Sequence, residues 1–296
     1  MSQERVLVTG ATSPLGQAVG RRLKSEGHHS IGTIRSQVPS EGLPMFDHLV
    51  YVDLENLTTI KNLDVEFDSV IHVAAESVGT PAHLMQVTNI ATTWLADVAF
   101  ARGIRNFIHV SSMSVYGQVE VPEVSATTKI NPTTPYGAAK WASECYLKSL
   151  SNRLPAVSIR SCGIVGRRSR RNFLAEVFAA MTNQQPRIYA SNPEFLFNNI
   201  IHEDTLASFM VHLALNHQSG FNAVPVGSSD PILLRAVLEM IADRTHFRGD
   251  VDWIPTKSQP FSIDISDATR IGLRPMNTSN SVKSWLDDAI GALPRS

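Results

Sequence analysis

Short hydrophobic runs alternate with amphipathic stretches through the first 165 residues of the chain. Runs such as Val6–Val8 and Val70–Ile71 are rich in β-branched residues and suit strands that are buried on both faces. Apolar residues also recur at helical spacing, for example Ala18, Val19 and Leu23, which suits a helix packed on a sheet. This alternation is typical of βαβ units, so the pattern predicts an α/β fold built on a parallel sheet.

The same pattern predicts where the individual elements lie. We expect strands at 5–9, 29–34, 48–52, 68–74, 105–112 and 156–161. We expect helices at 14–26, 81–102, 135–152 and 170–183. Prolines interrupt the pattern repeatedly after residue 185, so the second half of the chain is expected to be more irregular.

A glycine-containing turn follows the first expected strand directly and reads Thr9-Gly10-Ala11-Thr12-Ser13-Pro14-Leu15-Gly16. A strand, such a turn and a helix in this order form a dinucleotide-binding fingerprint. Gly10 permits the tight turn, Gly16 permits close packing of helix on strand, and the turn amides face the pyrophosphate. Ser13 replaces the usual middle glycine, and its hydroxyl could donate to a phosphate. Pro14 suits the first helical turn.

Tyr136 and Lys140 stand four positions apart, directly after Pro135, and would share one face of a helix. A cationic Lys140 is expected to lower the pKa of the Tyr136 phenol and to make it a candidate acid or base. The alternative is a surface Tyr–Lys pair on an amphipathic helix. The glycine-containing turn and the serine-rich segment 111–117 favour the catalytic interpretation.

Together these segments resemble the extended short-chain dehydrogenase/reductase superfamily, in its branch of NAD-dependent epimerases and dehydratases. The resemblance also includes residues 53–54, 70–75, 89, 107–117, 160–166, 199–204 and 222–227. It implies a Rossmann-type doubly wound parallel sheet with a smaller C-terminal substrate-binding lobe. Residues 1–165 would form the NAD(P)-binding domain, with a returning segment near 197–226. Residues 166–196 and 227–296 would form the lobe.

The resemblance implies a role for each of three residues. Tyr136 would be the general acid or base, and Lys140 would lower its pKa and hold the nicotinamide ribose. Ser112 would hold the substrate oxygen near Tyr136, although a serine at a strand end often bonds its own backbone instead. Ser111 and Ser114 are the nearest competitors for this role.

The residue after the second expected strand bears on the choice of cofactor. NAD-preferring members of the family place an Asp at the end of this strand to hold the ribose hydroxyls. Here Ile34 and Arg35 stand at that point, and a guanidinium suits a 2′-phosphate. We therefore expect NADP(H) as the preferred cofactor, with NAD(H) as the alternative. A surface arginine with no cofactor contact is the simplest other interpretation.

The remaining cofactor contacts come from the turn and from the resemblance. Asp53 and Leu54 would contact the adenine edge, although Asp53 could simply cap a strand end. The full expected set is Gly10, Thr12, Ser13, Pro14, Leu15, Gly16, Arg35, Asp53, Leu54, Ala74, Ala75, Asn89, Tyr136 and Lys140.

Features that bear on the substrate point in two directions. Arginines between Arg167 and Arg171 follow the last expected strand, where the family's substrate lobe opens, and could clamp a diphosphate. The alternative is a solvated helix start. Gly163 and Asn198 stand where many sugar-nucleotide members carry an Asn and an Arg. The expected substrate-binding residues are Ser77, Met113, Gly163, Arg167, Arg168 and Asn198.

The implied activity is hydride transfer at a secondary alcohol or ketone, preferably of a nucleotide-linked 4-keto sugar, by reduction or 4-epimerisation. Dehydratases of the family carry an acidic pair directly after the catalytic residue, where Met113 and Ser114 stand here, so dehydration is not expected. A carbonyl reductase for a non-nucleotide ketone stays open. So does a non-catalytic dinucleotide sensor, which would not need to retain Ser112, Tyr136 and Lys140.

Composition narrows the class of protein without identifying a substrate. A hydrophobic content of 43%, a charged content of 18% and a net charge of −1 are ordinary for a globular protein and indicate neither nucleic-acid nor membrane binding. No apolar run reaches membrane-spanning length, and the first residues lack the core of a signal peptide. Cys145 and Cys162 are isolated, which suggests buried reduced thiols in a cytoplasmic protein.

No histidine or cysteine spacing indicates a metal site. The resemblance adds one expectation about assembly. Family members commonly pair two helices from each subunit into a four-helix bundle, and the corresponding segments here are roughly 81–102 and 135–152. We therefore expect a homodimer.

Overall fold

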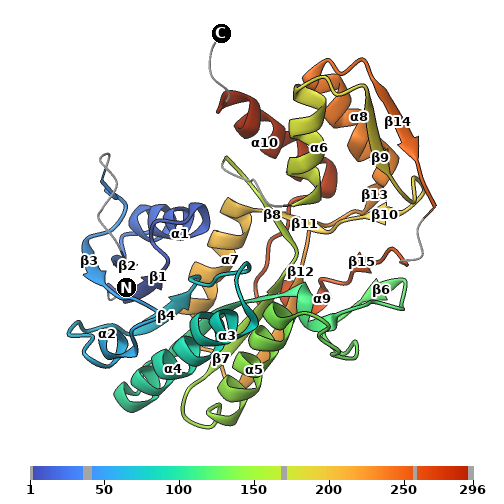
Figure 1. Ribbon diagram of the computed structural model, residues 1–296. Coiled ribbons are helices and arrows are strands. Elements are labelled where there is room, and N and C mark those ends of the chain that lie inside the picture. The colour runs from blue at the N-terminus through green and yellow to red at the C-terminus, as the bar shows by residue number, and fades with distance from the viewer. Residues whose placement is uncertain (1–2, 36–41, 168–171, 256–258, 293–296) are drawn as a thin grey trace.

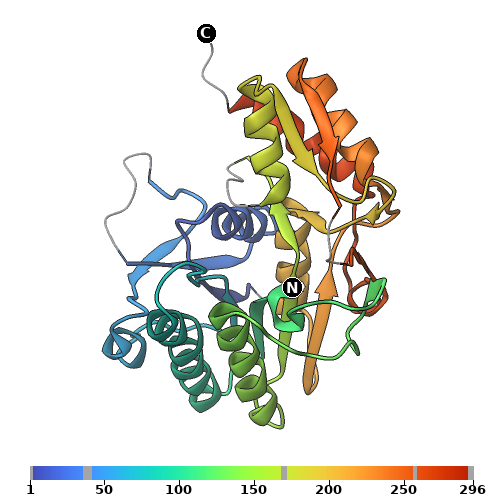
Figure 2. The same ribbon diagram turned by 45° about the vertical axis from the view of Figure 1, so that its right-hand side comes forward.

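A large parallel sheet flanked by helices forms the lower part of the molecule, and a smaller lobe stands above it (Figure 1). The computed structural model describes residues 3–35, 42–167, 172–255 and 259–292. The smaller lobe carries α6, α8 and α10 (Figure 1). The turned view in Figure 2 shows the same division between the two parts.

The strands of the main sheet are β1 (Arg5–Thr9), β2 (His29–Ile34), β3 (His48–Tyr51), β4 (Ser69–His72), β5 (Asn106–Ser112), β7 (Ala156–Ser161) and β12 (Phe221–Val226). The shorter strands are β6 (Glu123–Val124), β8 (Gly163–Val165), β9 (Arg187–Ala190), β10 (Leu196–Phe197), β11 (Ile200–His202), β13 (Ile232–Leu233), β14 (Asp250–Trp253) and β15 (Ser262–Ile263).

The helices are α1 (Pro14–Ser25), α2 (Leu57–Lys61), α3 (Pro81–Leu84), α4 (Ala91–Arg102), α5 (Pro135–Ser149), α6 (Phe173–Thr182), α7 (Glu203–Leu215), α8 (Leu234–Thr245), α9 (Ser266–Arg270) and α10 (Thr278–Gly291). A π-helical stretch, η1 (Met85–Ile90), joins α3 to α4, and a 3₁₀ turn, η2 (Met113–Tyr116), follows β5.

The main sheet confirms the predicted doubly wound parallel architecture. Its strand order is β12-β7-β5-β4-β1-β2-β3, and every pairing is parallel. The chain runs outward from β1 in one direction as far as β3 and then returns to the other side of β1 at β4. The order therefore reverses between β1 and β4, and in open α/β sheets ligands bind at the carboxyl ends of the strands at such a point.

Alternate residues of each central strand pack into opposite helical layers, as the period of two in a strand requires. Val6 and Val8 of β1 pack against α1 and α7, whereas Leu7 packs on the side of α2, α4 and α5. Figures 1 and 2 show α4 and α5 side by side on their face of the sheet. Because both faces are covered, the central strands carry hydrophobic residues on both faces, and this produced the apolar runs in the sequence.

The predicted strands lie where the sequence placed them, and the predicted helices needed two adjustments. The expected helix 81–102 is helical throughout but consists of α3, η1 and α4 rather than one regular α-helix. The expected helix 170–183 corresponds to α6, which begins at Phe173 after an Asn172 N-cap, and residues 170–171 lie outside the described residues. A π-helical stretch such as η1 is frequent near functional sites.

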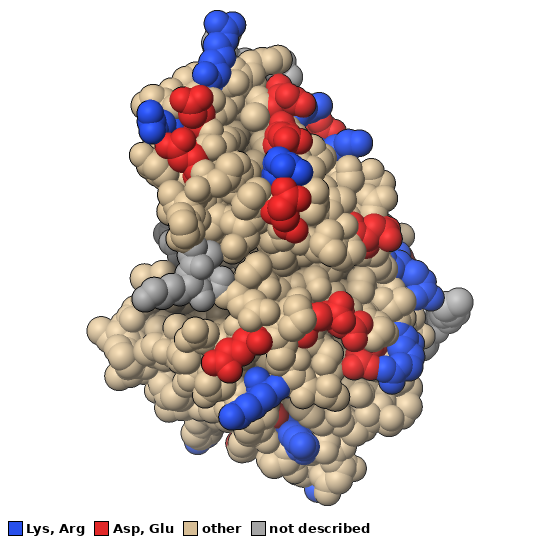
Figure 3. Space-filling view, turned by 90° about the vertical axis from the view of Figure 1, so that its right-hand side faces the viewer, with Lys and Arg blue, Asp and Glu red and all other residues tan. Residues whose placement is uncertain are grey.

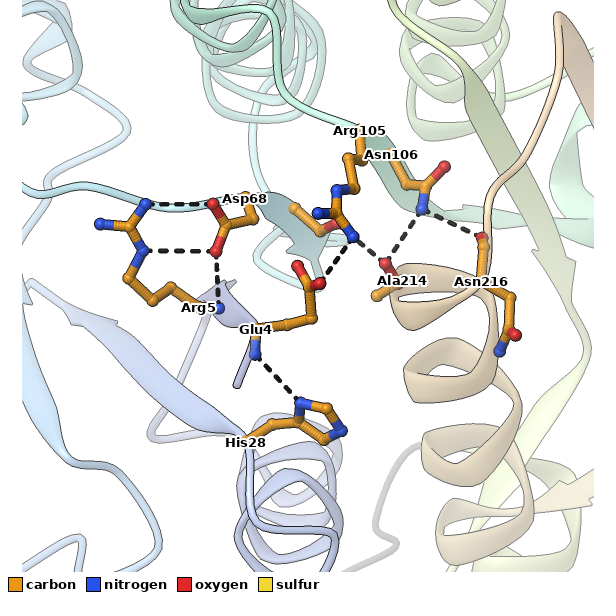
Figure 4. Close-up of polar contacts among 9 residues, drawn as sticks. Glu4, Arg5, His28, Asp68, Arg105, Asn106, Ala214 and Asn216 are labelled. Atoms are coloured by element: carbon orange, nitrogen blue, oxygen red, sulfur yellow. Dashed lines mark hydrogen bonds and ion pairs between the residues drawn. The ribbon is translucent and has the colours of Figure 1, made fainter. Parts of the chain in front are cut away.

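A polar cluster at the amino ends of the strands anchors the returning helix α7 (Figure 4). The buried Asn106 side chain, at the start of β5, donates to the carbonyls of Ala214 (2.9 Å) and Asn216 (3.1 Å). These carbonyls belong to the last turn of α7 and the residue after it, where the helix itself offers no donor. The cluster therefore holds the C-terminal end of α7 at the amino ends of the strands. The site described below lies at the opposite, carboxyl ends.

The smaller lobe has its own hydrophobic core, which includes Phe178, Leu238 and Trp285 from α6, α8 and α10. Two pairs of short strands lie between this lobe and the main sheet. β8 pairs in parallel with β11, and β15 pairs in parallel with β6. β12 then returns to the main sheet beside β7, within the segment 197–226 that was expected to return.

Within the described ranges no helix is long and apolar enough to cross a bilayer. Figure 3 shows acidic and basic side chains interspersed on the face that it presents. Both cysteines are free thiols, but Cys145 is exposed, so the expectation that both are buried is wrong for that residue.

Candidate active site

A cleft of about 970 Å³ lies at the carboxyl ends of β1 and β4, where the strand order reverses. Its floor includes the turn from Gly10 to Leu15 and the segment Val73–Val78, which follows β4. Tyr136 from α5 and the segment Cys162–Ile164 line the side toward the smaller lobe. The cleft therefore brings together four segments that are far apart in the sequence.

The glycines of the turn are required by close approaches of the backbone. Gly10 has a φ of +73°, and a Cβ there would lie 3.2 Å from the backbone of Ala74. A Cβ on Gly16 would lie 2.2 Å from the carbonyl oxygen of Gly10, which no side chain can tolerate. The turn can therefore bring its backbone against a ligand and against the segment after β4 only with glycine at these positions.

Ser13 is occupied within the turn and is the N-cap of α1. Its hydroxyl donates to the Gly10 carbonyl at 2.8 Å and accepts from the Gly16 amide at 3.0 Å. The predicted donation from Ser13 to a phosphate is therefore corrected, because this hydroxyl proton is already used. Among the hydrogen bonds of the described residues, none has the amide of Thr12 or Leu15 as donor. These amides at the start of α1 fit the pyrophosphate of a dinucleotide.

Tyr136 lies in the first turn of α5, which begins after a Thr134 N-cap with Pro135 at the first helical position. Burial raises the pKa of Tyr136 to about 12, and a hydrogen bond with Ser112 opposes part of this shift. The expectation that Lys140 lowers this pKa is not met. Burial outweighs any effect of the ammonium group, whose Nζ lies 5.9 Å from the centre of the phenol ring.

Lys140 is fully buried, and its Nζ donates to the carbonyl of Val110 on β5 at 2.6 Å. Burial lowers the pKa of Lys140 to about 7, while the charge of Glu144 opposes that shift. Lys140 lies on the buried side of Tyr136 and does not itself line the cleft. A lysine in this state gains or loses its proton near neutral pH.

Ser112 forms local hydrogen bonds at the end of β5 and also lies near Tyr136. It caps η2 by accepting from the amide of Ser114 at 3.1 Å, and its hydroxyl donates to the Ser114 hydroxyl at 3.1 Å. It also lies beside Tyr136 and lowers the pKa of that phenol. Ser111, a competitor for the same role, points away, because its buried hydroxyl donates to Glu144 at 2.5 Å. The structure therefore favours Ser112 as the serine beside Tyr136.

A buried ion pair behind the site was missed by the sequence reasoning. Arg160 on β7 donates through Nη2 to Glu144 on α5 at 2.8 Å and through Nη1 to the Tyr116 hydroxyl at 2.9 Å. The side chains of Arg160 and Glu144 are 5% and 0% exposed. Glu144 lies four residues after Lys140, and this helical spacing was the only sign in the sequence that the two share one face of α5. The pair ties α5 to β7 and so holds the helix that carries Tyr136 and Lys140.

Arg35 lies at the rim of the cleft, as its place after β2 predicts, but its guanidinium is paired. Nη1 of Arg35 lies 2.5 Å from Oε1 of Glu76, and the other carboxylate oxygen of Glu76 lies 2.8 Å from Nε2 of His83. Arg35 and Glu76 both line the cleft. The sequence reasoning missed Glu76 because its partners are 41 and 7 residues away.

Several other predicted residues line the cleft, and some do not. Those that line it are Thr12, Pro14, Leu15, Leu54, Ala74, Ala75, Ser77 and Gly163. Asp53 instead accepts from the amide of Glu55 at 3.0 Å, which is the capping alternative. The Asn89 amide donates to Ser143 on α5 at 3.3 Å and therefore acts in the packing of the helices beside the site.

Three of the expected substrate contacts are corrected by their positions. Asn198 is buried, and its amide bonds the carbonyls of Ser228 (3.1 Å) and Ile263 (2.8 Å) and accepts from the Ile263 amide (2.8 Å). Met113 packs against the cluster of Val115, Tyr116 and Val124. Arg167 is exposed and does not line the cleft. Arg168, like Arg170 and Arg171, lies outside the described residues.

Asn172 and Glu203 line the cleft without having been predicted. Asn172 caps α6 and donates to the Ile164 carbonyl at 3.1 Å. Glu203 begins α7, and burial together with the charge of Asp204 raises its pKa. Its neighbour His202 is buried, and Nδ1 of His202 lies 3.8 Å from the carboxylate of the exposed Asp204.

The chain is similar to proteins of known class over most of its length. A model of the NAD dependent epimerase/dehydratase family matches residues 6–222. The chain is 32% identical over 163 residues to a UDP-glucose 4-epimerase of Mycolicibacterium smegmatis, covering 50% of this chain and 51% of that protein. It is 27% identical over 162 residues to a dTDP-glucose 4,6-dehydratase of Streptomyces antibioticus, covering 47% and 46%. Each match thus spans about half the relative's length.

Solved structures are similar over the whole chain. A UDP-N-acetylglucosamine 4-epimerase from Methanobrevibacter ruminantium, solved with UDP-N-acetylmuramic acid, superposes with a TM-score of 0.82. The alignment covers 99% of this chain and 100% of that chain at 20% identity. At this level of identity the likeness shows the fold.

Proposed function

The chain belongs to the NAD-dependent epimerase/dehydratase family, and we propose that it is an NAD(P)-dependent oxidoreductase or epimerase acting at a secondary alcohol or ketone of a nucleotide-linked sugar. The observation that carries this proposal is the position of Tyr136. It lines the cleft beside Ser112, at the carboxyl ends of the strands, where the Thr12 and Leu15 amides have no acceptor among the described residues. The activities of the two relatives above support a sugar-nucleotide substrate.

In this proposal the chain's own residues hold the substrate oxygen and move its proton. Ser112 and Tyr136 bind the oxygen, and the Tyr136 hydroxyl gives a proton to it or takes one from it. When bound, the nicotinamide ring supplies or accepts the hydride. Because the pKa of Tyr136 is raised to about 12 by burial, the phenol is held protonated and suits proton donation to a carbonyl. Lys140 favours the reverse direction by stabilising the phenolate whenever it carries a proton.

The residues at the cleft fit a nicotinamide dinucleotide. The Thr12 and Leu15 amides would face its pyrophosphate, and Leu54 would face the adenine. The choice between NAD(H) and NADP(H) depends on Arg35, whose guanidinium is paired with Glu76. The same residues would serve reduction and 4-epimerisation, because both reactions begin with the same hydride step.

A carbonyl reductase acting on a non-nucleotide ketone is the second candidate. It is favoured by Asn198, which is buried and fully hydrogen-bonded where many sugar-nucleotide members carry a diphosphate-binding Arg. For the first candidate to hold, Arg168, Arg170 and Arg171, which lie outside the described residues, would have to take over that role.

Uridine and thymidine diphosphate are expected to bind the cofactor-loaded protein if the substrate is a nucleotide sugar. Each charge-assisted contact to the diphosphate contributes about 1.5–3 kcal/mol, so binding should weaken when the salt concentration rises or when Arg168, Arg170 and Arg171 are replaced by Ala. Calorimetry at two ionic strengths measures this directly. No heat at millimolar ligand would reject the nucleotide-sugar substrate and favour the carbonyl reductase.

We also expect a homodimer formed by α4 and α5. The two helices lie together on one face of the sheet, and half-buried Trp94 and Val98 lie on α4. A second copy of this helix pair would complete a four-helix bundle and bury them. Sedimentation at micromolar concentration should give twice the chain mass, and a monomer would reject this arrangement. A cytoplasmic location stays a prediction.

A further inference from the structure

Three charged or titratable side chains meet at the rim of the cleft and form what we call the Glu76 cluster: Arg35, Glu76 and His83. The carboxylate of Glu76 is shared between its two partners, with Oε1 2.5 Å from Arg35 and Oε2 2.8 Å from His83. The Glu76 side chain is 31% exposed, whereas the Arg35 side chain is 62% exposed. Hydrogen bonds from His83 and Arg35 lower the pKa of Glu76 and keep it ionised.

The cluster spans the centre of the sheet. Arg35 follows β2 directly, whereas Glu76 comes from the segment after β4, and β1 lies between these two strands. The pair must therefore reach across the carboxyl end of β1, where the Gly10 turn lies. A second bond holds Glu76 in place, because Thr88 of η1 donates to its backbone carbonyl at 3.1 Å. The carboxylate is thus fixed from the β4 side and directed toward the end of β2.

In dinucleotide-binding folds the adenosine ribose lies at the end of the second strand, so Arg35 and Glu76 meet where the 2′ substituent is recognised. The two common dinucleotides differ only at this substituent. The 2′-hydroxyl of NAD can donate to a carboxylate, as it does to the family's usual Asp. The 2′-phosphate of NADP needs the positive charge of Arg35, which Glu76 already neutralises, and it would meet the negative charge of Glu76 itself.

We propose that Glu76 is the specificity-determining residue for the cofactor and that it selects NAD(H) over NADP(H). The carboxylate of Glu76 takes the place of the Asp missing at Ile34, and it holds Arg35 away from a 2′-phosphate. This inference rests on the proposed function, because it requires that the cleft binds a nicotinamide dinucleotide. It also reverses the preference that Arg35 alone suggested from the sequence.

The test is a set of calorimetric titrations with NAD, NADP and adenosine 2′,5′-bisphosphate, which carries the 2′-phosphate without the nicotinamide half. The wild-type protein should bind NAD about tenfold or more tightly than NADP. Glu76→Gln frees Arg35 and removes the negative charge, so affinity for NADP and for the bisphosphate should rise by about ten- to a hundredfold. Arg35→Ala added to Glu76→Gln should abolish that gain.

Glu194→Gln is the matched control. Glu194 forms an exposed ion pair with Arg235 at 2.9 Å in the smaller lobe and does not line the cleft. This control should leave the ratio of the two affinities unchanged. If wild type binds NADP at least as tightly as NAD, or if Glu76→Gln shifts the ratio no more than the control does, the assignment of Glu76 is overturned. If wild type binds neither dinucleotide, the proposed function falls with it.

Discussion

Tyr136→Phe is expected to reduce turnover by about a hundred- to ten-thousandfold while leaving cofactor affinity nearly unchanged. The substitution removes the only group on Tyr136 that can exchange a proton with a substrate oxygen, and loss of a general acid or base has effects of this size. The phenyl ring retains the packing of the side chain in the cleft wall. Turnover of a nucleotide sugar with the bound cofactor and a separate dinucleotide titration together measure the two effects.

Tyr146→Phe is a matched control for this substitution. Tyr146 lies on the same helix, but its hydroxyl donates to Asp97 on α4 and does not face the cleft. It should retain full turnover. Lys140→Met should lower both turnover and cofactor affinity, because Lys140 is expected to act on Tyr136 and on the nicotinamide ribose. Near wild-type turnover in Tyr136→Phe would remove Tyr136 from the chemistry.

Glu144→Ala is expected to destabilise the protein by about 3–5 kcal/mol, the largest effect on stability that we expect from a single substitution outside the hydrophobic core. The change leaves the guanidinium of Arg160 buried without its carboxylate partner and also removes the acceptor of the Ser111 hydroxyl. Urea denaturation followed by circular dichroism measures the change in the free energy of unfolding.

Two further variants separate the charge from the volume of Glu144. Glu194→Ala breaks an exposed ion pair and should cost about 0–1 kcal/mol. Replacing both members of the buried pair, Glu144→Gln with Arg160→Met, should recover much of the loss, because no unpaired charge then remains buried. A loss below about 1 kcal/mol in Glu144→Ala would show that water or another acceptor reaches Arg160, contrary to its burial.

Local patterns predicted the elements and part of the site. The continuous apolar runs of the central strands predicted a sheet covered on both faces, because both neighbouring layers demand hydrophobic residues. The turn from Gly10 to Gly16 and the pair Tyr136–Lys140 were recognisable since their members lie within a few residues of one another. A glycine that must pass close to backbone, or two side chains one helical turn apart, leaves a signature in the sequence itself.

What only the tertiary structure decided depends on contacts between distant segments. The sequence placed Arg35 at the end of β2, but the ion pair with Glu76 arises only because β1 lies between β2 and β4. The raised pKa of Tyr136 likewise follows from burial, which no local spacing reveals. Asn198 was predicted to contact the substrate, but the fold buries it, and its amide bonds backbone carbonyls of two other segments. The sequence thus determined which chemical groups the chain carries near its site, whereas their charge states and partners depend on which segments the fold packs together.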